Sequence, residues 1–214
     1  MAGDSVGTFT QALAALKRRG SGLLVVGAAA QETHLAACRR LLGEDGQERR
    51  RLVVLTDGVP GADARTDDDD ATRVIDRRPA TRGATASAAP SAAGPSDLVT
   101  LEREVVAAVE SIEREADGLD PAELRVCIDS LRTLVDGHDA EAVEEFLDGV
   151  LTAVRDVDGM CHVHFPVDRD GEAAARFADQ FDATIEVQLP AGADRVEQRW
   201  HLREPELSTD WLPL

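Results

Sequence analysis

A short apolar run that leads through a glycine into an amphipathic helix is the feature that most limits the folds open to this chain. Residues 23–26 have the length and composition of a buried strand, and residues 30–42 place apolar side chains on one helical face. A second buried strand is predicted at residues 52–56. Two buried strands joined through a helix require a crossover connection, so this segment predicts a parallel sheet with right-handed crossovers.

The same alternation of elements continues to the C-terminal part of the chain. Further helices and strands are predicted, in chain order, at residues 8–19, 96–118, 124–131, 139–157, 160–165 and 171–181. The last two segments, 184–189 and 196–202, alternate apolar and polar residues and predict a β-hairpin at a sheet edge. We therefore expect an α/β fold with a mostly parallel sheet and a C-terminal antiparallel hairpin.

Residues 58–96 interrupt this pattern. They contain an acidic run at 67–70, one short possible strand at 73–76, and a stretch from 79 to 96 with no aliphatic residue larger than alanine. Such a stretch cannot offset the entropy lost when it becomes ordered. We expect one domain over residues 1–214, interrupted by a disordered acidic and Ala/Ser/Pro-rich insertion at about 60–95.

The charge of the chain limits its partners and its surroundings. It has 41 acidic and 23 basic residues, a net charge of −18, and Lys17 is its only lysine. Dispersed acid with almost no lysine is typical of proteins from organisms that live in multimolar salt, where self-repulsion is screened; a general acidic interaction surface is the alternative. The charge argues against binding nucleic acid or an anionic membrane.

Two further features indicate a cytoplasmic protein. No apolar run approaches the roughly 18 residues that span a bilayer, and no signal peptide opens the sequence. Cys38, Cys127 and Cys161 form no CxxC pattern and lie within apolar runs. We expect them to be buried, reduced thiols.

The segment after the first strand occupies the place of a phosphate-binding P-loop, G-x-x-x-x-G-K-[ST]. Gly27 supplies the first glycine, but Glu32, Thr33 and His34 stand where the second glycine, the lysine and the hydroxyl residue belong. The first two replacements shift the local charge by two units against a polyanion. Each unit at contact distance is worth roughly 1 kcal/mol in water and about 4 in a partly buried site. We interpret the segment as a phosphate loop that has lost the residues needed to bind phosphate and Mg²⁺.

The strand at 124–131 resembles a Walker B strand, in which an aspartate follows the apolar residues and holds Mg²⁺ through water. Asp129 occupies that position, at the edge of the sheet where ligands bind in open α/β folds. Asp57 is the residue nearest to the position of a catalytic glutamate. Ser130 lacks the G-x-S-x-G elbow of a nucleophile, and we expect its hydroxyl to cap the turn.

Taken in order, these motifs resemble the RecA/KaiC-like ATPase superfamily, and most closely its uncharacterised haloarchaeal members with degenerate phosphate loops. The resemblance covers nearly the whole chain and rests on residues 22–27, 96–99, 128–134, 145–147, 181–187 and a basic-apolar strand before Trp211. It implies a RecA-like three-layer sandwich with Gly27 and Asp129 at neighbouring strand ends. It also implies that Gly27, Thr33 and Asp129 are the remnants of a nucleotide site.

A second candidate site is His162-Val163-His164. Alternate residues of a strand face the same side, so both imidazoles can point one way, and Asp168 follows shortly after. Zinc hydrolases use such pairs, but the third and fourth ligands are unassigned, and a solvated or loop-covered polar face is the favoured interpretation. His34, together with His138 and His201, is expected at the surface or at a helix end.

The function that these observations favour is non-enzymatic. We expect a degenerate RecA/KaiC-like module with no catalytic residues and no cofactor, which regulates or assembles with a protein partner or with itself in the cytoplasm of a halophilic archaeon. The first alternative is a nucleotide-binding protein or slow ATPase that uses Mg-ATP. The more distant alternative is a metal-dependent hydrolase built on His162, His164 and Asp168.

Overall fold

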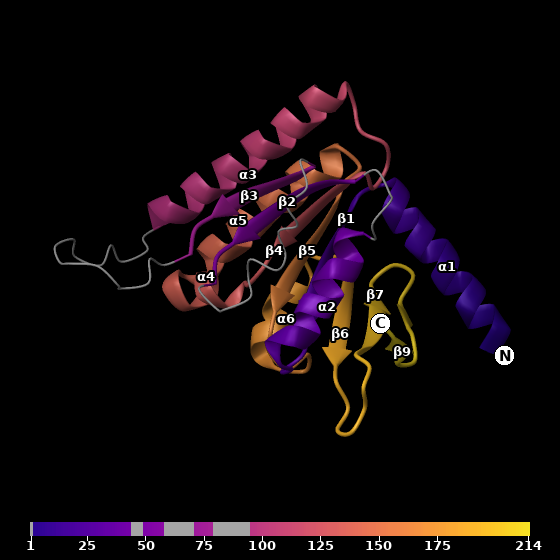
Figure 1. Cartoon of the computed structure of the whole chain (residues 1–214). Helices are drawn as coiled ribbons and strands as arrows, with labels where there is room; N and C mark the ends of the chain where they lie inside the picture. Colours follow the sequence, from indigo (N-terminus) through magenta and orange to yellow (C-terminus); the bar gives the residue numbers. More distant parts are fainter. Residues whose placement is uncertain (1, 44–48, 58–70, 79–94) are drawn as a thin grey trace.

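One mixed sheet organises the molecule. The computed structural model describes residues 2–43, 49–57, 71–78 and 95–214. Within these ranges the strands form a single sheet in the order β3-β2-β4-β5-β1-β6-β7-β8, with β9 paired to β7 (Figure 1). Their bounds are β1 (Ser21–Val26), β2 (Arg50–Leu55), β3 (Thr72–Asp76), β4 (Leu124–Ile128), β5 (Met160–Phe165), β6 (Ala183–Gln188), β7 (Glu197–Leu202), β8 (Leu207–Ser208) and β9 (Leu212–Pro213).

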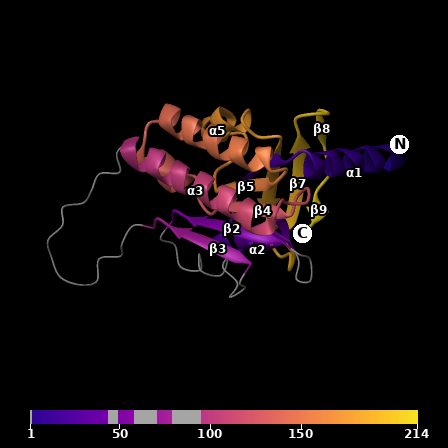
Figure 2. The ribbon, with the colours of Figure 1, turned by 90° about the horizontal axis from the view of Figure 1, so that it is seen from above.

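Helices cover both faces of this sheet. They are α1 (Ala2–Arg18), α2 (Gln31–Leu42), α3 (Pro95–Ala116), α4 (Arg132–Gly137), α5 (Ala140–Asp156) and α6 (Glu172–Ala178). Figure 2 shows α3 and α5 on one face and α2 on the other. The expected three-layer α/β sandwich, with a mostly parallel central sheet and C-terminal antiparallel strands, is confirmed.

The strands in the middle of the sheet form because both of their faces are buried. β1, β4 and β5 are buried at every position, as parallel strands covered by helices on both sides must be. Alternation along β1 sends Leu24 and Val26 into the core beneath α3 and α5. Leu23 and Val25 pack instead on the opposite face, with side chains from α1 and α2. Every polar side chain on these strands is therefore enclosed by protein.

The two strands that lead to Gly27 and Asp129 are not neighbours in the sheet, although the resemblance implied that they would be. β5 lies between β1 and β4 and pairs in parallel with both of them. Gly27 and Asp129 follow strands that share this carboxyl edge but are not neighbours, so the expectation of neighbouring strand ends is wrong. The physical consequence is that the end of β5, with His164 and Phe165, separates the two remnants.

Part of the predicted insertion forms a β-strand. Residues 72–76 form β3, which pairs in parallel with β2 and becomes the edge strand of the sheet. The rest of the predicted disorder, at 60–70 and 79–94, lies outside the described residues. β3 is tied to α3 by two ion pairs at the surface, Arg73 with Glu115 and Arg77 with Glu104.

Short elements are the ones that the periodicity did not predict. α4, β8 and β9 have six, two and two residues, which is too short for a hydrophobic repeat to become visible. α3 begins at Pro95, one residue before the start predicted from the sequence, in agreement with the preference of proline for the first helical turn. No helix in the described part of the chain has the length and apolar character needed to cross a membrane.

The excess of acid over base predicts that salt stabilises this fold. The Debye length falls from about 10 Å at 0.1 M salt to about 3 Å at 1 M, which screens repulsion among the surface carboxylates. We expect the melting temperature, followed by circular dichroism, to rise steadily between about 0.1 and 2 M KCl at pH 7, because the net charge of −18 is then screened.

The control is the same KCl series near pH 4.5, close to the isoelectric point of about 4.6, where the net charge of the chain approaches zero. The dependence on KCl should be much weaker there. A melting temperature that is insensitive to KCl at pH 7 would contradict the expectation of halophilic adaptation.

Candidate functional site

The carboxyl edge of the sheet carries a cavity of about 210 Å³. Its walls come from the loops after β1, β2, β4 and β5 and from the first turns of α2 and α4. The lining residues are Ala29, Gln31, His34, Asp57, Asp129, Ser130, Arg132, His164 and Pro166. Several of the predicted site residues therefore meet here, although they come from separate parts of the sequence.

Gly27 is held in this loop by packing. Its φ of +137° is one that L side chains rarely adopt. A Cβ added there would collide with the carbonyl oxygen of Val187 on β6. Its amide donates to the carbonyl of Val167 (2.9 Å), and its own carbonyl accepts a hydrogen bond from Nε2 of His34 (2.9 Å). The glycine that the P-loop pattern retains is thus explained by the close approach of β6.

The other two predicted nucleotide-site residues also serve the fold. The amide of Thr33 donates to the carbonyl of Ala30 in the first turn of α2 (3.0 Å), and its side chain is buried. One carboxylate oxygen of Asp129 accepts from the amide of Thr56 (2.7 Å) and lies 2.8 Å from the Thr56 hydroxyl. Asp129 is 5% exposed and ties the end of β4 to the end of β2.

Two side chains at this edge differ from their predicted roles. The hydroxyl of Ser130 is buried and has no hydrogen-bond partner among the described residues, so the prediction that it caps the turn is wrong. His34 has the predicted helix-end position, in the first turn of α2, but it is only 3% exposed, so the predicted alternative of a surface position is wrong. Its burial follows from the direction of α2, which turns the side chain toward the sheet and the loop carbonyl of Gly27.

Four potential metal ligands meet on the face of the sheet beneath α2. His162 and His164 alternate along β5, Cys127 is the register partner of His162 on β4, and Cys38 comes from α2. Their ligand atoms all lie within 4.8 Å of one another, and all four residues are at most 2% exposed. We call these four residues the Cys/His cluster.

Contacts inside the cluster are short. The two sulfur atoms of Cys38 and Cys127 are 3.3 Å apart, and Nε2 of His162 is 3.4 Å from Sγ of Cys38. The rings of His162 and His164 meet edge to face with their centroids 5.2 Å apart. The predicted pair of imidazoles on one strand face is present, and two cysteines that were expected only to fill the core lie against it.

A chain of imidazoles connects the cluster to the loop at Gly27. Nδ1 of His34 is 3.1 Å from Nδ1 of His164. Since Nε2 of His34 faces a carbonyl oxygen, which only accepts, that nitrogen carries the proton and Nδ1 of the neutral ring is an acceptor. The proton between the rings then belongs to Nδ1 of His164. A neutral His164 thereby presents an unprotonated Nε2, which is buried and has no hydrogen-bond partner among the described residues.

The pKa of the Cys38 thiol in the cluster is shifted in the opposite direction to that of Cys161 outside it. Burial raises the pKa of the Cys38 thiol, but its contacts with Cys127 and then with His162 outweigh burial and hold that pKa well below its usual value. Cys161 is equally buried but faces the core beneath α3 and α5, and burial raises its pKa to about 12. Burial lowers the pKa of His164 to about 3, so its ring is neutral near pH 7.

Asp168 does not join its predicted histidine partners. It is exposed in the turn after β5 and is not one of the residues that converge on the cluster. The sequence did contain a signal for the true neighbours: Cys127 sits in a strand and Cys38 on the apolar side of a helix. What it could not show is which strands are adjacent and which face of the sheet α2 covers.

Removing the hydroxyl of Thr56 tests whether Asp129 serves the fold. We expect Thr56→Val to lower the free energy of unfolding, measured by urea denaturation, by about 1.5–3 kcal/mol, because the hydroxyl proton that Asp129 (2.8 Å) and the Ser130 carbonyl (2.6 Å) share is lost from a buried site. Thr56→Ser keeps the hydroxyl and should lose less. Equal stability of the valine variant and the wild type contradicts a structural role for this contact.

Comparison with known proteins places the chain in a family. No curated protein matches it. A model described as a family of unknown function, DUF7504, matches residues 20–187, a range that contains the cavity lining and all four residues of the Cys/His cluster. Because this match covers more than half of its residues, the chain belongs to the DUF7504 family.

Proposed function

We propose that this protein is a non-catalytic RecA/KaiC-like module with a regulatory or protein-interaction role in the cytoplasm of a halophilic archaeon. The observation that carries the proposal is the state of its two nucleotide-site remnants. The carboxylate of Asp129 accepts a hydrogen bond from the amide of Thr56, and the amide of Gly27 donates to the carbonyl of Val167. Groups that a working site directs at Mg²⁺ and phosphate are here directed at protein.

Charge and space at the carboxyl edge support the same proposal. The positive end of a helix dipole attracts anions, but the first turn of α2 already carries the carboxylate of Glu32. The cavity of about 210 Å³ is smaller than the roughly 300–1,000 Å³ of ordinary ligand pockets. A triphosphate would therefore meet like charge in a site with too little room.

The position of the cavity favours a second candidate, a nucleotide-binding protein or slow ATPase. Ligands of open α/β sheets bind at the carboxyl ends of the strands, where this cavity lies. Arg132 contributes a cation to its lining, and backbone amides at the start of α2 are a general anion-binding element. This candidate requires the phosphates to bind beside the carboxylates of Asp57 and Asp129, which also line the cavity.

Calorimetric titration of the full chain with Mg-ATP in about 2 M KCl separates the two candidates, since that salt screens the repulsion within the fold. We expect no saturable heat at millimolar nucleotide, because the Walker lysine is replaced by Thr33 and Asp129 is engaged by Thr56. Titration with MgCl₂ alone is the control for metal heats. Millimolar or tighter binding that Asp129→Ala abolishes, in a variant shown to be folded, would overturn the non-catalytic proposal.

Association is the positive expectation of this proposal. α1 projects from the body of the molecule, with its C-terminal part packed at the sheet (Figure 1). We expect multi-angle light scattering in the same buffer to give a mass above that of the 22.9 kDa chain as its concentration rises. A constant monomer mass up to about 0.1 mM, where even contacts worth only roughly 5.5 kcal/mol would be half-populated, would exclude self-association as the activity.

A further inference from the structure

The Cys/His cluster is more than a group of buried polar residues. We propose that Cys38, Cys127, His162 and His164 together bind one tetrahedral transition-metal ion, with Zn²⁺ as the ion that this donor set favours. Two thiolates and two imidazoles are a frequent ligand set of structural zinc sites. The inference stands independently of whether the module binds nucleotide.

The distances agree with a single ion at the centre of the cluster. Zinc bonds of about 2.3 Å to sulfur and 2.0–2.1 Å to nitrogen, at tetrahedral angles, separate the ligand atoms by about 3.3–3.8 Å. The sulfur atoms of Cys38 and Cys127 are 3.3 Å apart, and the sulfur of Cys38 is 3.4 Å from the nitrogen of His162. All four donors lie within 4.8 Å. Bringing separations of up to 4.8 Å into that range requires side-chain movements of about 1 Å.

The protonation pattern leaves a donor atom for the metal. Nε2 of His164 is buried, has no hydrogen-bond partner among the described residues, and is left unprotonated by the contacts of the opposite nitrogen. An unsatisfied buried polar atom costs free energy, and a metal bond at Nε2 removes that cost. His34 accepts the hydrogen bond from Nδ1 of His164 and donates from Nε2 to the carbonyl of Gly27, so it acts as a positioning residue.

Charge balance also favours the ion. On binding, the thiol protons of Cys38 and Cys127 pass to solvent, and the two thiolates neutralise the divalent cation. The site therefore stays uncharged inside the core, where an unpaired charge would be costly. The cavity at the carboxyl edge, whose lining includes His34 and His164, provides a route by which an ion enters.

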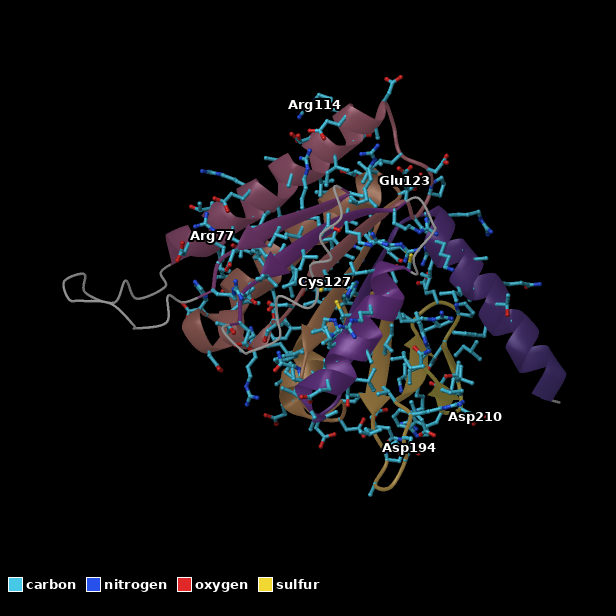
Figure 3. The ribbon with its side chains drawn as sticks, in the orientation of Figure 1. Arg77, Arg114, Glu123, Cys127, Asp194 and Asp210 are labelled. Carbon is cyan, nitrogen blue, oxygen red and sulfur yellow. The ribbon has the colours of Figure 1, made fainter. Side chains whose placement is uncertain are left out.

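The location explains what such an ion does for the protein. Cys127, labelled in Figure 3, lies on β4, Cys38 lies on α2 and the two histidines lie on β5, so one ion would join the helix to two strands. Four protein ligands leave no open coordination position, which assigns the ion to folding and to the fixed position of α2. It also separates this site from the metal-dependent hydrolase considered from the sequence, which needs an open position for water.

Cobalt is the probe that tests the proposal. The full chain, purified without a histidine tag, reduced and stripped of metal in KCl buffer, is titrated with Co²⁺. We expect one Co²⁺ per chain, the intense visible bands of tetrahedral cobalt, a thiolate-to-cobalt charge-transfer band, and loss of these bands when Zn²⁺ is added. The same protein loaded with Zn²⁺ should melt at a higher temperature than the stripped protein, because the ion binds only the folded site.

Variants locate the site, and the third cysteine supplies the control. Cys127→Ser should weaken cobalt uptake and reduce the charge-transfer band, whereas Cys161→Ala, on the same strand as the histidines but facing the opposite core, should leave both unchanged. His34→Leu should keep the tetrahedral spectrum but lower the affinity about 10–100-fold, as expected for a residue that orients a metal ligand.

Three results of the cobalt experiment would overturn the proposal. They are no cobalt uptake by the reduced wild type at millimolar metal, a spectrum without thiolate charge transfer, or uptake that Cys127→Ser leaves unchanged. Formation of a Cys38–Cys127 disulfide that persists under the reducing conditions also overturns it, because that bond removes both thiolate ligands. The sulfur atoms, which are 3.3 Å apart, would close to about 2.05 Å. The wild-type stoichiometry and spectrum decide the question even if a variant fails to fold.

Discussion

Burial of the central strands on both faces is the constraint on which the rest of this structure depends. β1, β4 and β5 lie between helices, so no polar side chain on them can be satisfied by bulk water. Asp129, just beyond β4, finds the amide and hydroxyl of Thr56, and His164 finds His34. The polar groups that a nucleotide site would leave available for its ligand are instead used to hold strand ends together.

The same constraint produces the Cys/His cluster. Alternation along β5 sends Cys161 into the core beneath α3 and α5, and it sends His162 and His164 to the face beneath α2. That face is otherwise apolar around the cluster, with Val53 and Leu55 of β2 beside Cys127. Two imidazoles on such a face need partners of their own, and the two thiols and His34 are the groups that the fold brings to them.

Much of the architecture could be predicted from the sequence because long buried elements have a clear hydrophobic periodicity. The helices at 31–42 and 140–156 and the strand at 160–165 were predicted to within a residue or two. The candidate site was harder, because its parts depend on strand order. The insertion of β5 between β1 and β4 separates Gly27 from Asp129, and no local pattern in either strand records that insertion.

What the sequence determined by itself was local: which segments are buried, which residues replace those of a P-loop, and that two histidines share one face of a strand. Each of these depends on spacing within one element, at a period of 3.6 or 2 residues. Only the tertiary structure decided that Cys38, Cys127 and His34 are the neighbours of those histidines. They come from α2 and β4, and proximity between separate elements is set by how the sheet is ordered and which face each helix covers.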